Sequence, residues 1–79
     1  MTAPSPDRFV ASYREMANED LAGMERALDR DLASATTTDQ RAAALARLMA
    51  INYVRLEREP NPIVRARLDV LTREAFRHD

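Results

Sequence analysis

Residues 42–56 have the sequence AAALARLMAINYVRL, and the fold of this chain follows from them. These residues are apolar nearly all round a helix, and Arg47 and Asn52 are the only polar exceptions before Arg55. A helix that is apolar on most of its circumference is buried from more than one side. We therefore expect this segment to pack against several neighbours, within the chain or outside it.

Local signals on both sides of this segment set the bounds of a helix. The sequence Thr37-Thr38-Asp39-Gln40 fits a capping box, in which a threonine hydroxyl and a glutamine side chain satisfy free amides at a helix start. Pro60 disfavours helical backbone at the residue before it. These signals predict a helix over residues 38–59.

A second helix is predicted over residues 62–77. Asn61 followed by Pro62 supplies an N-cap side chain and a proline at the first helical position. Two apolar stripes follow, because apolar residues three or four positions apart share a helix face. One stripe contains Val64, Leu68, Leu71 and Ala75, and the other contains Ile63, Ala66 and Val70.

The N-terminal part of the chain predicts one long helix over residues 6–33. Ser5-Pro6-Asp7 combines an N-cap hydroxyl, a proline at the first position and an acid in the first turn. Large apolar residues then recur along a single stripe, with Gly23 as its weak point. Residues 1–5 are small and rich in proline, and we expect a disordered lead-in there.

Short connections between helices make neighbours antiparallel, so these elements predict an all-α, three-helix antiparallel bundle in one domain over residues 6–79. The bundle consists of a long helical hairpin and a third helix. A core in a chain of this size supplies only about 3 to 5 kcal/mol. The 79 residues include no cysteine, so no disulfide adds to that stability. We therefore expect self-association to complete the bundle.

The composition argues against catalysis, cofactors and metal. The chain has one glycine, one histidine and no lysine or cysteine, so phosphate-binding loops and activated nucleophiles have no residues to form them. No stretch has the about 20 apolar residues of a membrane span, and no export signal is evident. We expect a cytoplasmic protein that is not an enzyme and has no small-molecule substrate. All 12 basic residues are arginine and alanine is abundant, which suggests a bacterial or phage origin.

Nucleic-acid binding is the alternative function. Residues 1–33 carry four arginines against seven acids, whereas residues 40–59 carry four against two. The basic half, with its short Pro-Asn-Pro turn, superficially resembles a helix-turn-helix and would suit a small regulator or a phage packaging-type protein. Its candidate contacts are Arg47, Arg55, Arg58, Arg65 and Arg67. Pairing of the acidic helix with the basic helix inside the chain explains the same charge split more simply.

Protein binding is the function that we expect first. Three helices leave apolar surface uncovered, and Asp20 and Asn52 fall within apolar arcs, where polar groups are costly unless they are paired or at an interface. We predict a non-enzymatic, adaptor-like or inhibitor-like regulatory protein that forms a homo-oligomer and binds another protein. The candidate interface residues are Asp20, Leu48, Ile51, Asn52, Ile63, Ala66 and Val70.

Overall fold

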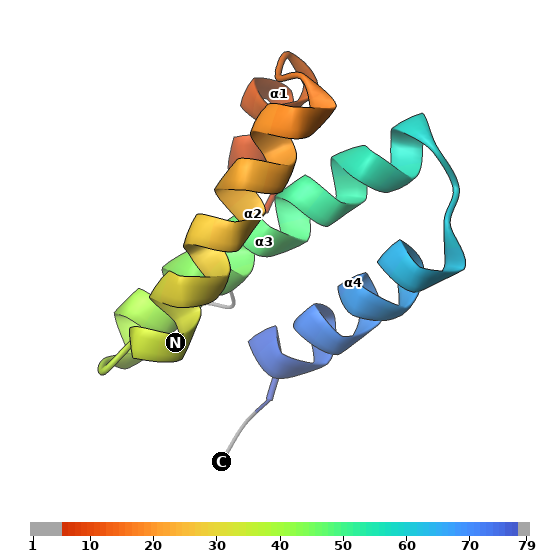
Figure 1. Cartoon of the computed structure of the whole chain (residues 1–79). Coiled ribbons are helices and arrows are strands. Elements are labelled where there is room, and N and C mark those ends of the chain that lie inside the picture. The colour runs from red at the N-terminus through yellow and green to blue at the C-terminus, as the bar shows by residue number, and fades with distance from the viewer. Residues whose placement is uncertain (1–5, 78–79) are drawn as a thin grey trace.

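A computed structural model of the chain describes residues 6–77, and this part consists of four helices without strands (Figure 1). The helices are α1 (Asp7–Arg14), α2 (Asn18–Ser34), α3 (Thr38–Arg58) and α4 (Pro62–Ala75). The all-α class is therefore confirmed. The predicted lead-in over residues 1–5 lies outside the described residues.

The prediction of three helices is wrong, because the segment predicted as one helix over residues 6–33 forms two. Helix α1 ends at Arg14, and Ala17 has extended backbone with φ −69° and ψ 155°. Asn18 then begins α2, with Glu19 and Asp20 in its first turn, where acids complement the positive end of the helix dipole. Helical periodicity alone did not reveal this break, because α1 and α2 each bury a stripe against the same helix.

Helix α3 lies at the centre of the fold, and α1, α2 and α4 all pack against it. The guanidinium of Arg47 lies over the Phe9 ring, and Arg14 pairs with Glu57, so α1 runs parallel to α3. Asn18 bonds to Arg58 and Glu25 to Asn52, so α2 runs antiparallel to α3. Helix α4 also runs antiparallel to α3, and its Glu74 pairs with Arg41 near the start of α3.

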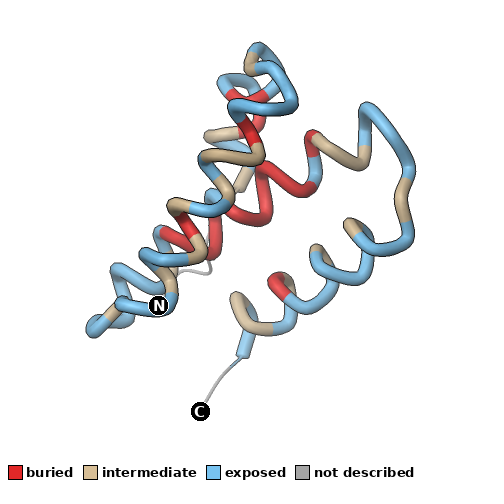
Figure 2. Tube along the Cα trace, in the orientation of Figure 1, coloured by how far each residue is buried: buried red, intermediate tan, exposed pale blue. Residues whose placement is uncertain are grey.

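The core explains why α3 is apolar on nearly all sides. Leu48, Ala50 and Ile51 have no exposed surface, and most of the buried chain belongs to α3 (Figure 2). The side of α3 that a three-helix bundle would leave uncovered is occupied by Val10 and Tyr13 of α1. Most of the apolar surface of α3 is thus covered by helices of the same chain, and this surface is not evidence for a partner.

Capping side chains place the starts of α3 and α4. The Thr37 hydroxyl accepts a hydrogen bond from the Gln40 amide at 3.1 Å, and the Gln40 side chain accepts one from the Thr36 amide at 2.9 Å. The Asn61 side chain accepts from the Ile63 amide at 2.8 Å. Both helices begin at the residues that the cap signals indicate, because these signals depend on neighbours along the chain.

Arg58, in the last turn of α3, stabilises the break between α1 and α2. Its guanidinium donates to the carbonyl oxygens of Arg14 and Met16 at 2.9 and 2.6 Å and to the Asn18 side chain at 2.7 Å. These carbonyls lie at or just beyond the end of α1, where no helical amide reaches them. One charged side chain therefore holds the connection in place.

Arg58→Ala should lower the free energy of unfolding by about 1 to 2 kcal/mol, because the charge-assisted hydrogen bonds to the α1–α2 connection are lost. Urea denaturation followed by circular dichroism at 222 nm measures this change. Arg30→Ala is the control, since Arg30 is an exposed arginine of α2 whose side chain has no hydrogen bond or ion pair in the described chain. Equal stability of the two variants would contradict the role of Arg58.

Gly23→Ala should raise the free energy of unfolding by about 0.5 to 1 kcal/mol, because glycine costs more backbone entropy than alanine inside a helix. Gly23 has no positive φ, and an added methyl group would meet its nearest side-chain atom, in Arg26, only at 3.8 Å. The same urea titration tests this prediction. A loss of stability would show that α2 does not pass through Gly23 as a regular helix.

Candidate interaction surface

Three of the predicted interface residues lie inside the chain's own core. Leu48 and Ile51 are 0% exposed and Asn52 is 1% exposed. They are not accessible to a partner in this fold. Other helices of the same chain cover this part of α3, and Asn52, for example, bonds to Glu25 of α2.

Asp20 lies on the surface rather than in an apolar arc. It is an exposed residue in the first turn of α2, close to the positive end of the helix dipole. The break at residues 15–17 ends the apolar stripe that would have enclosed it. Its position therefore needs no partner to compensate the charge.

Asn52 connects α3 to α2. Its amide nitrogen donates to the Glu25 carboxylate at 2.9 Å and to the Leu48 carbonyl at 2.8 Å. The Asn52 side-chain oxygen is buried without a hydrogen-bond partner. Glu25 also accepts from Arg55 at 2.6 Å and lies 3.4 Å from Arg67. This network links α2, α3 and α4, and it gives the buried asparagine a role in helix register within the chain.

The outward face of α4 carries the other three predicted residues, Ile63, Ala66 and Val70. Ile63 is 79% exposed and Val70 is 54% exposed, and Ala66 is exposed between them. The stripe that contains Leu68, Leu71 and Ala75 packs on α3, with Leu71 buried and Leu68 and Ala75 partly buried. Helix α4 therefore has an inner apolar stripe in contact with the core and an outer apolar stripe in contact with solvent.

Two hollows lie beside the outer stripe, between α2 and α4. One has a volume of about 230 Å³ and is bordered by Ile63, and the other has about 470 Å³ and is bordered by Val70. Arg67 and Asp29 line both hollows, and an ion pair joins them. The ion pair fixes α4 to α2, so the outer stripe stands on a helix anchored at its middle.

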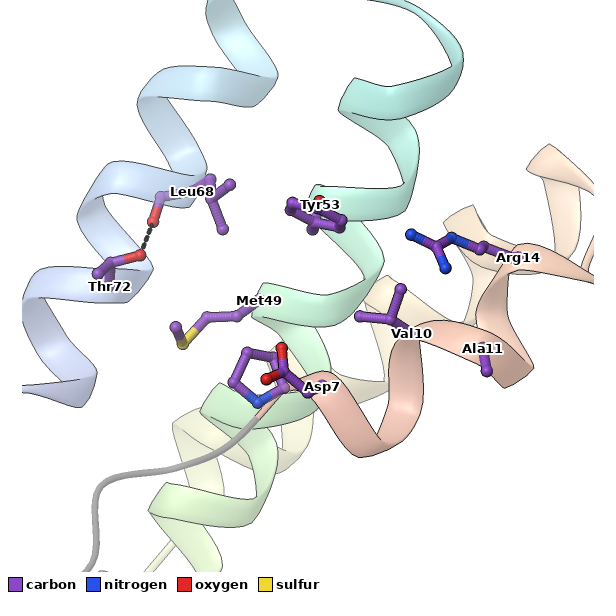
Figure 3. A pocket seen from close by; sticks show the side chains of 9 residues that line it. Asp7, Val10, Ala11, Arg14, Met49, Tyr53, Leu68 and Thr72 are labelled. Carbon is purple, nitrogen blue, oxygen red and sulfur yellow. Dashed lines mark hydrogen bonds between the residues drawn. The ribbon is translucent and has the colours of Figure 1, made fainter.

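A third groove lies on the opposite side of α4, between α1, α3 and α4 (Figure 3). Its volume is about 430 Å³, and its apolar lining includes Val10, Met49, Tyr53 and Leu68. Polar groups stand among them, including Thr72, whose hydroxyl donates to the Leu68 carbonyl at 2.8 Å. Sequence reasoning missed this groove because it exists only when α1 is a separate helix.

Four of the five predicted nucleic-acid contacts bind groups of their own chain. Arg47 lies 5.2 Å above the Phe9 ring, Arg55 bonds to Glu25, Arg58 bonds to the α1–α2 connection and Arg67 bonds to Asp29. Among the five, only the side chain of Arg65 has no ion pair or hydrogen bond within residues 6–77. The charge split of the sequence is therefore used mainly to join the helices.

The titratable groups with shifted pKa values belong to the contacts of α1 with α3. Burial raises the pKa of Tyr13, and the nearby Arg47 partly opposes this effect. The hydrogen bond from Arg14 lowers the pKa of Glu57, and the same bond raises the pKa of Arg14. None of these groups lines the outer stripe of α4.

Within residues 6–77, no three side chains of the metal-binding types gather in one place, and no helix has the length and apolarity to cross a bilayer. The outer stripe of α4, with its two hollows, is the candidate interaction surface. No protein family matches the chain, and neither a curated protein nor a solved structure shows significant similarity to it.

Proposed function

We propose that this chain is a non-enzymatic protein-interaction module that forms a homo-oligomer through the outer stripe of α4. The observation that supports the proposal is the exposure of Ile63 and Val70, at 79% and 54%, on a helix whose inner stripe already completes the core. Burial of a branched aliphatic side chain contributes about 1.5 to 3 kcal/mol. The two side chains together therefore offer a useful part of a binding energy.

The anchoring of α4 favours binding, because a preformed surface loses little entropy when a partner docks. Arg67 joins α4 to α2, and Glu74 joins α4 to Arg41 of α3 at 2.6 Å. Both ion pairs lie beside the outer stripe rather than on it. The stripe is thus held in a defined orientation and is left free for contact.

Nucleic-acid binding has less support, since most of the candidate arginines bind acids, carbonyl groups or an aromatic ring of their own chain. A phosphate would have to compete with these contacts. Binding carried mainly by Arg65 would supply few of the phosphate contacts that such affinity requires.

Val70→Glu should convert the assembly to monomers while leaving the helical signal nearly unchanged, because Val70 is half-exposed in the single chain and a buried carboxylate would oppose association. Size-exclusion chromatography with light scattering measures the mass, and circular dichroism measures the helicity. Tyr53→Glu is the matched control, since Tyr53 is 46% exposed but lines the groove on the other side of α4.

Two outcomes would contradict the proposal. A wild-type chain that remains monomeric at micromolar concentration removes the homo-oligomer. Dissociation by Tyr53→Glu but not by Val70→Glu would move the interface to the groove between α1, α3 and α4.

A further inference from the structure

We propose that two copies of the chain pair through their α4 helices in an antiparallel register, with the twofold axis passing next to Arg67. This inference rests on the proposed function, and it identifies the partner of the outer stripe as a second copy and specifies its orientation. Charge, shape and the position of Arg67 each point to this register.

Charge complementarity is the first reason. Arg65 and Asp69 are exposed, and neither side chain has a hydrogen bond or ion pair in the described part of its own chain. They stand four residues apart, about 6 Å along the axis and roughly 40° around it, and therefore on the same flank of α4. In an antiparallel pair centred on position 67, Arg65 of each copy lies level with Asp69 of the other. The register thus creates two ion pairs from four unpaired charges.

Shape complementarity supports the same register. With the centre at position 67, Ile63 of one copy lies level with position 71 of the other, beside Val70 and Glu74 of that copy. Those residues border the 470 Å³ hollow between α2 and α4. Ile63, the most exposed large apolar side chain within residues 6–77, thus meets the larger of the two hollows, and twofold symmetry repeats the contact. Ala66, near the axis, lets the two backbones approach closely.

Arg67 would oppose the pairing if its charge were free, because twofold symmetry brings the two Arg67 residues to the same level. In this chain the Arg67 guanidinium pairs with Asp29 and lies 3.4 Å from Glu25, on the α2 side of the helix. Asp29 therefore balances its charge, and the contacts with Asp29 and Glu25, which also pairs with Arg55, hold it away from the axis. An antiparallel pair of α4 helices does not bring two unbalanced positive charges together.

Two charge reversals test the register. In Arg65→Glu, each acid at position 65 faces Asp69 of the other copy, and in Asp69→Arg each arginine at position 69 faces Arg65 of the other copy. Each variant alone should dimerise with a dissociation constant raised about tenfold or more. An equimolar mixture of the two should form the heterodimer, because both contacts then join opposite charges. Native mass spectrometry separates the three dimers by mass, and sedimentation velocity gives the dissociation constants.

The double variant Arg65→Glu/Asp69→Arg is the control for folding, because it carries both substitutions and should dimerise like the wild-type chain. Interactions within one chain cannot produce a preference for the heterodimer. Val70→Glu and the wild-type chain complete the series, so that failure of the register is separated from failure of the proposed interface.

A dimeric wild-type chain that Val70→Glu dissociates, but whose single charge variants still form homodimers and mix statistically, would overturn the antiparallel register and leave the proposed interface standing. Single variants that dissociate without forming a heterodimer would also overturn the register. A monomeric wild-type chain would overturn both the register and the homo-oligomer.

Discussion

The apolar circumference of α3 determines where α1, α2 and α4 must lie, because each of them covers part of it. Leu48, Ala50 and Ile51 have no exposed surface, so α3 must be covered on three sides by other helices. A long helical hairpin with one further helix would cover α3 on two sides only. The break at residues 15–17 supplies it, because α1 turns back and runs parallel to α3 while α2 runs antiparallel to it. Arg58, in the last turn of α3, stabilises that break through hydrogen bonds to the Arg14 and Met16 carbonyls.

In this arrangement α4 keeps an apolar stripe exposed to solvent. Its inner stripe packs on α3, and ion pairs from Arg67 and Glu74 attach it to α2 and α3. Its outer stripe has no cover in the described chain, and Ile63 is the most exposed of the large apolar residues. An interface on α4 therefore does not lower the stability of the single chain. The residues that stabilise the chain and the residues proposed to bind lie on different faces of the same helix.

Some parts of this structure can be predicted from sequence, because they depend on neighbours along the chain. The starts of α3 and α4 follow from the Thr37 and Asn61 caps, and the two stripes of α4 follow from helical spacing. The break after Arg14 depends on Arg58, more than 40 residues away, and no local pattern reports that contact. Asn18-Glu19-Asp20 resembles a helix start, but only the packing of α1 on α3 turns that signal into a break. The candidate interface residues Leu48, Ile51 and Asn52 lie in the core, on a part of α3 that other helices of the chain cover.

Residues 7–34 form two helices rather than one, and these two helices lie antiparallel to each other on α3. The chain has no cysteine, so spin labels on cysteines introduced at Arg8 and Arg30, in a sample diluted with excess unlabelled chain, report the distance within one copy by double electron–electron resonance. Both positions are exposed, and neither side chain has an ion pair or hydrogen bond in the described chain. One continuous helix would separate the two positions by about 33 Å. The structure predicts a much shorter distance, since Phe9 and Leu28 both lie near Arg47. A distance distribution centred near the value for a continuous helix would contradict the fold and the account of α3 burial built on it.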